Sequence, residues 1–278
     1  MKRLTGVFLL LIGFVISSKG QQTIGTYLGD ESALYAATKQ VNQFFRRFNS
    51  EEDLKGNRIY KGSKHFRNPK TRRKYLKVLF DNETSQINAD AKNGFIAQVT
   101  NGASPFFLDF HGGEWFAEVR TKFLYHGKEE TAILFMELQE EKVGSKWVIK
   151  NVYFEPFVKL FEKEKENKEK FLHPLSHELA FMNLQRIFSD KSEVEEYTAN
   201  DFRPDHLSLF LFEIKRSSLE FKSVTDLTFH FFQADNWYFE LKEFNRSGYN
   251  TGWLIANLVK ANEQEKDLLR KYIYFENR

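Results

Sequence analysis

The sequence contains no cysteine, and after residue 16 it has no apolar run long enough to cross a membrane. The absence of cysteine excludes disulfide bonds and a lipid-anchored lipoprotein, so the folded protein depends on its core for stability. Three motifs are also missing: a phosphate-binding glycine-rich loop, a Gly-x-Ser-x-Gly nucleophile turn and a His-Glu-x-x-His zinc helix. No enzyme class is therefore indicated by a motif, and we expect no cofactor.

The first 20 residues have the pattern of a secretory signal peptide. Lys2 and Arg3 provide a positive start, Val7–Ile16 is apolar, and small residues precede Gln21. An apolar stretch of this length is shorter than the ~20 residues that a transmembrane helix needs. We therefore expect a cleaved signal and a periplasmic or secreted mature protein with no membrane span. An uncleaved N-terminal anchor is the alternative.

The net charge of the chain comes entirely from this N-terminal segment. The full sequence has 41 Lys and Arg against 38 Asp and Glu, a formal charge of +3. Lys2, Arg3 and Lys19 lie within the first 20 residues, which hold no acid, so the rest of the chain is neutral. A neutral chain gives no reason to expect a nucleic acid partner. Its 30 phenylalanines predict a large aromatic core or aromatic-lined cavities.

The hydrophobic pattern divides the chain into two halves of similar order, with helices first and strands after. We expect domains at 21–158 and 173–278, joined by a charged linker at 159–172 in which Lys and Glu alternate. In the first half, the periodicity predicts helices at 31–49 and 72–80, then strands at 106–110, 114–125, 131–139 and 146–154. In the second half it predicts helices at 176–188 and 205–216, strands at 219–221, 227–234, 236–244 and 252–259, and a final strand or short helix ending at Phe275.

The last hairpin of each half carries the same short motif. Trp147 and Trp253 each follow a small-residue turn and begin a strand of the form Trp-apolar-Ile-x-Asn-apolar. This match indicates an internal duplication.

The layout of an opening helix followed by long antiparallel strands resembles the NTF2-like (cystatin-like) fold. The residues that carry the resemblance are 31–49, 114–125, 131–139 and the strand that begins at Trp147, with their counterparts in the second half. It implies an α+β protein of two tandem cones, each with helices packed on a curved antiparallel sheet around an aromatic interior. Two such copies behind a signal peptide are similar to exported bacterial proteins. No single activity follows, because the family contains enzymes, ligand binders and protein-interaction modules.

The densest charge in the chain lies between residues 55 and 77, which hold ten Lys and Arg and no acid. Seven of the ten recur at every third residue, with Tyr60, Phe66 and Tyr75 between them. A strip of this kind can bind phosphates, an anionic polymer or an acidic protein surface. The binding residues that we predict are Arg58, Lys61, Lys64, Arg67, Lys70 and Arg73. The alternative is a solvated loop whose charge is balanced by acids nearby in the fold.

Asp109 and His111 are the only pair that the pattern offers for catalysis. On a strand, residues two apart share a face, and a carboxylate beside a histidine can orient the imidazole as a general base. Gly112 and Gly113 follow directly, which favours an ordinary hairpin turn as the alternative.

His173 and His177 have the spacing of helical metal ligands, but Pro174 disfavours a helix there and no third ligand is evident. No metal site is therefore predicted. We expect an exported, non-catalytic binding or scaffolding protein whose partner is a protein or an anionic polymer. The alternative is a small-molecule enzyme, of isomerase or hydrolase type, acting in an NTF2-like pocket.

Overall fold

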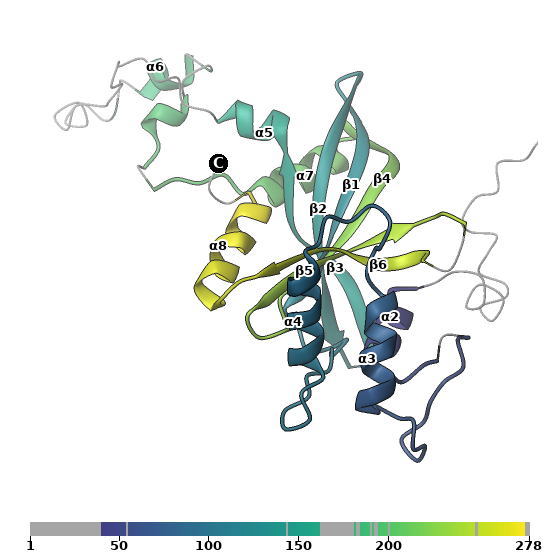
Figure 1. The fold of residues 1–278 in the computed structure, drawn as a ribbon. Helices are drawn as coiled ribbons and strands as arrows, with labels where there is room; N and C mark the ends of the chain where they lie inside the picture. Colours follow the sequence, from purple (N-terminus) through teal and green to yellow (C-terminus); the bar gives the residue numbers. More distant parts are fainter. Residues whose placement is uncertain are drawn as a thin grey trace, which may run out of the picture. The chain divides into compact units, whose positions relative to one another are not determined.

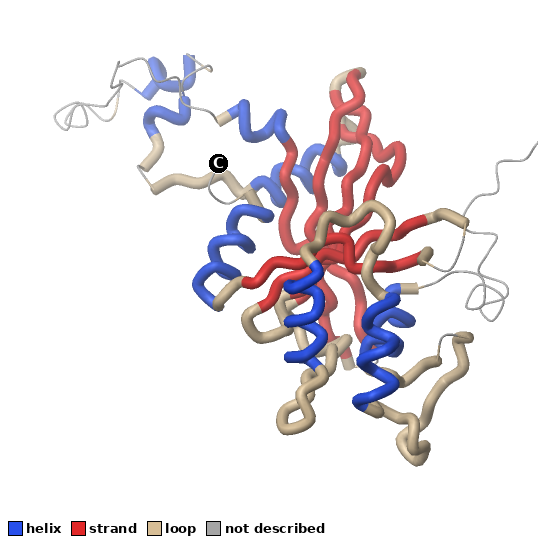
Figure 2. Tube along the Cα trace, in the orientation of Figure 1, coloured by secondary structure: helices blue, strands red, loops and turns tan. Residues whose placement is uncertain are grey.

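The computed structural model describes residues 40–53, 55–142, 144–161, 201–247 and 250–275, with residues 181, 184–189, 191 and 194–199 between them. The predicted signal peptide and most of the predicted linker lie outside the described residues, as does the start of the first predicted helix in each half. The described part contains seven α-helices and six strands (Figures 1 and 2).

The helices are α2 (Val41–Phe48), α3 (Pro69–Val78), α4 (Ala89–Val99), α5 (Glu155–Leu160), α6 (Leu184–Ser189), α7 (His206–Lys215) and α8 (Glu263–Ile273), with a 3-10 turn at Val194–Tyr197. The strands are β1 (Trp115–Tyr125), β2 (Lys128–Glu141), β3 (Gly144–Phe154), β4 (Leu219–Phe231), β5 (Trp237–Phe244) and β6 (Gly252–Lys260). All six strands form one antiparallel sheet, so the predicted α+β class is confirmed. Within the described residues, no helix is long and apolar enough to span a membrane.

Each half contributes a three-stranded meander, and the first strands of the two meanders pair with each other. The strand order is β3-β2-β1-β4-β5-β6, which is symmetric about the β1–β4 pair. β1 runs antiparallel to β4 along its whole length, from Trp115 opposite Phe231 to Tyr125 opposite Leu219. Two separate sheets would leave β1 and β4 as edges with unpaired backbone groups, and this pairing removes both edges.

Alternation along the strands gives the sheet two different faces. Trp115 and Ala117 of β1 pack in the cluster formed with α2–α4, whereas Phe116 between them packs against α8. Lys266 holds α8 in place, because its buried ammonium donates to the carbonyl oxygens of Phe232 (2.9 Å) and Ala234 (2.8 Å). The helices α2–α4 and α8 therefore cover opposite faces of the sheet (Figure 1).

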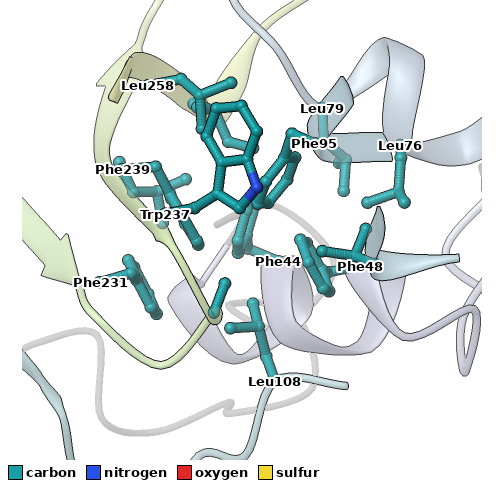
Figure 3. Close-up of a cluster of buried hydrophobic side chains, with 14 of the residues drawn as sticks. Phe44, Phe48, Leu76, Leu79, Phe95, Leu108, Phe231, Trp237, Phe239 and Leu258 are labelled. Atoms are coloured by element: carbon teal, nitrogen blue, oxygen red, sulfur yellow. The ribbon is translucent and has the colours of Figure 1, made fainter. Parts of the chain in front are cut away.

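The larger core lies between α2–α4 and the sheet and is rich in phenylalanine (Figure 3). Phe44 and Phe48 of α2 and Phe95 of α4 contact Phe231 of β4 and Phe239 of β5, with ring-centroid distances between 5.7 and 6.3 Å. The helices of the first half therefore cover strands of the second half.

The helix α7 of the second half covers strands of the first half in return. Phe210 of α7 packs against Phe123 of β1 at 5.2 Å and Phe154 of β3 at 6.3 Å. The two halves therefore share one sheet, and each half buries apolar surface on the other. This arrangement differs from the predicted two cones, which would each have had a sheet of their own.

Three local predictions differ from the structure. Residues 89–99 form α4, which was not predicted, and its N-terminus is capped by the side chain of Asn88, which accepts the N–H of Asp90 at 2.7 Å. Residues 106–110 form no strand, because the amide of Asn49 binds both the N–H and the C=O of Leu108. The two short strands predicted within 219–234 are one strand, β4, with irregular register against β1.

Candidate functional site

The predicted basic residues lie on the loop 55–68 and on α3, which follows it directly (Figure 1). The three-residue period does not continue through the segment, because α3 begins at Pro69 with Asn68 as its N-cap. On α3 the exposed cations are spaced i, i+3, i+4 and i+7, which places them on one side of the helix. We call the exposed cations of loop and helix, apart from Arg67, which pairs with Glu51, the basic surface: Lys55, Arg58, Lys61, Lys64, Lys70, Arg73, Lys74 and Lys77.

Of the three acids nearest in sequence, Asp53 lies beside Lys55, and the other two pair with arginines outside the basic surface. Glu52 is buried and pairs with Arg46 at 2.8 Å and Arg47 at 3.1 Å. Glu51 pairs with Arg67, whose Nη2 lies 2.6 Å from Glu51 Oε1. In the part of the chain that the structure describes, no ion pair joins an acid to Arg58, Lys61, Lys64 or Lys70.

Two of the six predicted binding residues are tied to neighbouring side chains. Besides its pair with Glu51, the guanidinium of Arg67 lies 4.3 Å from the ring centroid of Phe107. Arg73 Nε donates to Thr100 Oγ1 at 3.1 Å. The other four project into solvent, and Tyr60, which precedes Lys61, is 74% exposed.

Arg72, in the middle of the same basic segment, belongs to the core. Its guanidinium donates to the backbone carbonyl oxygens of Phe48 (2.8 Å), Val99 (2.7 Å) and Phe106. Burial, and then the nearby charge of Arg67, lowers the pKa of Arg72 to about 10, so the side chain stays protonated at neutral pH. It is fully enclosed and cannot contribute to a binding surface.

Asp109 and His111 lie in one turn, but the carboxylate does not contact the imidazole ring. Asp109 Oδ1 accepts the backbone N–H of His111 at 3.0 Å, which is a turn interaction. The imidazole Nδ1 lies 3.0 Å from Oγ of Ser145 at the start of β3, and both side chains are exposed. Asp109 therefore binds the backbone of His111 and does not orient its imidazole ring.

No group of three or more His, Asp or Glu side chains is arranged to hold a metal ion within the described ranges. His173 and His177 lie outside those ranges.

A cavity of about 310 Å³ opens on the α8 face of the sheet, and none of its residues was predicted as a site. Side chains of three neighbouring strands, β1, β4 and β5, give it a strongly charged lining. The acidic and basic members are Glu118, Arg120, Asp226, His230, Glu240 and Lys242. The concentration of charge on a partly buried surface makes this cavity a second candidate site.

Side chains on this face form an unbroken hydrogen-bonded chain. His230 is 3% exposed; its Nδ1 lies 2.7 Å from the hydroxyl of Tyr238, and its Nε2 lies 3.1 Å from Glu118 Oε2. The hydroxyl of Tyr238 donates to Glu240 Oε1 at 2.9 Å, and Asn257 Nδ2 donates to the same oxygen at 3.1 Å. The chain therefore crosses the sheet from β1 to β6, and its two carboxylates, Glu118 and Glu240, line the cavity.

The surroundings shift the pKa values of two members of this chain. Burial alone would raise the pKa of Glu118, but the hydrogen bond from His230 and the charge of Arg120, 2.7 Å away, outweigh it and lower the pKa. Burial, and then the negative charge of Glu240, raises the pKa of Tyr238. At neutral pH Glu118 is therefore ionised and Tyr238 is a protonated donor.

The sequence signal for this cavity is that its polar residues recur at every second position along each strand. The polar residues on this face are Glu118 and Arg120 on β1, Asp226, Thr228 and His230 on β4, and Glu240 and Lys242 on β5. The period predicts that members of one strand share a face. It does not predict which strands are neighbours, and the contact of Glu118 with His230 spans 112 positions.

Comparison of the chain with protein-family models, with curated proteins and with solved structures found no match. The basic surface and the charged cavity are the two candidate functional sites of the described residues.

Proposed function

We propose that this chain is an exported, non-catalytic binding or scaffolding protein whose basic surface holds an anionic polymer or an acidic protein surface. The observation that supports the proposal is a set of eight exposed cations on one loop and one helix. Arg58, Lys61, Lys64 and Lys70 carry it most directly, because no acid among the described residues neutralises them. The export component rests on the sequence of residues 1–20 alone.

Exposed cations bind a polyanion mainly through Coulomb attraction and the release of its counterions, and both contributions weaken as salt rises. A single exposed ion pair contributes little, about 0–1 kcal/mol. The binding strength therefore depends on several cations that act together. Tyr60 adds an exposed aromatic ring within the same loop.

Heparin, a sulfated polysaccharide, is a suitable first probe. We expect the protein to be retained on a heparin column and to elute earlier in a salt gradient when four residues are reversed: Arg58→Glu, Lys61→Glu, Lys64→Glu and Lys70→Glu. Arg67 is left unchanged, because a glutamate there would lie against Glu51 and disturb the fold.

The matched control carries the same change of charge at exposed lysines elsewhere: Lys128→Glu, Lys150→Glu, Lys215→Glu and Lys260→Glu. Earlier elution of the first variant alone supports the basic surface. Equal elution of the two variants would mean that total charge controls retention, and the proposal would be abandoned. A polyglutamate column run in parallel separates preference for a carboxylate surface from preference for a sulfated polymer.

We further propose that the two halves arose by duplication and that the fold is NTF2-like. The symmetric strand order supports a duplication, as does the position of Trp147 and Trp253 on the third strand of each half. The layer of α2–α4 on one face of the sheet supports the NTF2-like assignment.

The enzyme alternative requires a pocket that excludes bulk water around its reacting groups. The space between α2–α4 and the sheet is filled by phenylalanine and other apolar side chains (Figure 3). An active site of this kind would therefore lie outside that space, as the charged cavity on the α8 face does.

A further inference from the structure

We propose that the cavity on the α8 face binds a small zwitterionic molecule, one that carries a protonated amine and a carboxylate as a free amino acid does. The cavity volume of about 310 Å³ is at the lower end of the range for small-molecule sites, about 300–1,000 Å³. This proposal does not depend on the basic surface, which lies on other elements of the chain.

The hydrogen-bonded chain makes Glu240 an acceptor. A phenol has one proton, so Tyr238, which donates to Glu240 Oε1, can only accept from His230, whose Nδ1 must then carry a hydrogen. Glu240 is therefore the acceptor at which the donation from His230 through Tyr238 ends.

One oxygen of Glu240 is left for a ligand. Tyr238 and Asn257 both donate to Oε1. Oε2 has no hydrogen-bond partner among the described residues, and the side chain lines the cavity. A carboxylate oxygen held in place by donors on its other oxygen is a preorganised acceptor for an ammonium group.

Lys242 supplies the opposite charge two residues further along β5. Residues two apart on a strand point to the same face and are separated by about 7 Å. Across the described part of the chain, Lys242 has no ion pair, and its side chain lines the same cavity. The amine and carboxylate of an amino acid, each with a hydrogen bond of about 2.8 Å, can bridge two side chains whose Cα atoms are this far apart.

Glu118 and Arg120, two of the other charged groups of the cavity, pair with each other. Asp226 lies opposite Arg120 in the β1–β4 register and, like Lys242, has no ion pair among the described residues. Glu240 and Lys242 are the pair that a ligand can bridge. The C-terminal end of α8 adds an apolar wall through Ile273 and the adjacent Phe275, which suits a ligand with a hydrophobic side chain.

Isothermal titration calorimetry with L-leucine and L-phenylalanine tests the proposal. We expect binding of at least one of them, and at least tenfold weaker binding of its N-acetyl derivative, which lacks the ammonium, and of its amide, which lacks the carboxylate. Glu240→Gln and Lys242→Met should each weaken binding of the free amino acid at least tenfold. Glutamine at 240 can still accept from Tyr238, so the hydrogen bond that supports the fold is kept.

The matched controls are Glu243→Gln and Lys260→Met, which make the same substitutions at exposed positions outside the cavity. They should bind as the unmodified protein does, and thermal unfolding should confirm that all four variants are folded. Three outcomes would overturn the proposal: no binding of either amino acid up to about 10 mM, equal binding of the blocked derivatives, or unchanged binding by the two cavity variants.

Discussion

Arg72 joins three backbone segments that are distant in sequence, because its guanidinium donates to carbonyl oxygens of Phe48, Val99 and Phe106. Arg72→Met removes the donors and keeps an apolar side chain in their place. A buried polar group that loses its partner costs roughly 1–3 kcal/mol. We therefore expect the free energy of unfolding to fall by about 3 kcal/mol or more, measured by urea denaturation.

The neighbouring residue provides the control. Arg73 is exposed and makes one hydrogen bond, to Thr100, so Arg73→Met should lower the free energy of unfolding by less than about 1 kcal/mol. Equal unfolding midpoints for the two variants would contradict the role of Arg72 in the core.

At the residue scale, the sequence predicts charge but not its environment. Arg72 lies four residues before buried Leu76, and this spacing indicates a shared helical face. Arginine is rarely fully buried, and the carbonyl groups that make burial favourable come from other segments. His230 presents the same difficulty, because its partner Glu118 lies on a different strand of the other half. A residue whose partners are distant in sequence cannot be assigned from its local pattern.

At the scale of elements, the end of α3 is fastened to β6. Phe80 forms an isolated parallel bridge with Ile255, and the N–H of Asp81 donates to the carbonyl of Ile255 at 3.0 Å. Arg246 Nη2 lies 2.6 Å from Asp81 Oδ1. Burial alone would raise the pKa of Asp81, but hydrogen bonds from Thr84, Arg246 and backbone N–H groups outweigh it and lower the pKa to about 2.

This carboxylate predicts a loss of stability in acid. Because the pKa of Asp81 is lower in the folded protein than its ordinary value of 3.8, its contribution is complete above pH 3.8 and is lost as the pH falls through 2. The contribution is about 2 kcal/mol. Urea denaturation at pH 7, 4 and 2 should therefore show a smaller acid-induced loss for Asp81→Asn than for the unmodified protein. Asp267→Asn, an exposed acid on α8, is the control and should follow the unmodified protein; identical pH curves for all three proteins would disprove the assignment.

The elements that the sequence predicts well are those with a clear local signal. The strands predicted at 114–125 and 131–139 correspond to β1 and β2, and the turn between them is made by His126 and Gly127, both with positive φ as a type I′ turn requires. For the segment that forms α8, the sequence analysis predicts either a strand or a short helix. Asn262 and Glu265 form a capping box at its start, which is a local signal for a helix. The helix α4 was missed because a glycine interrupts a short apolar pattern.

At the scale of the whole molecule, helices of each half pack on strands of the other half as well as on their own. The helices α2 and α4 pack on β4 and β5, and α7 packs on β1 and β3. The sequence predicts the order of elements within each half, because that order depends on local periodicity. It does not predict the joint sheet, since the pairing of β1 with β4 depends on contacts between residues about 100 positions apart. The charged cavity follows from the same pairing and was missed for the same reason.

Because helices of each half are covered by strands of the other half, we predict that neither half folds alone. In a fragment of residues 39–161, Phe44, Phe48 and Phe95 lose the rings of Phe231 and Phe239 that cover them, and β1 becomes an exposed edge. We expect this fragment and a fragment of 201–278 each to lack cooperative thermal unfolding and dispersed amide resonances when expressed separately. Co-expressed, they should form a one-to-one complex that unfolds cooperatively, because association restores both the sheet and the shared core. Cooperative unfolding of either fragment by itself would contradict this prediction. It would show that the strands of that half suffice to cover its helices and that the half is an independent domain.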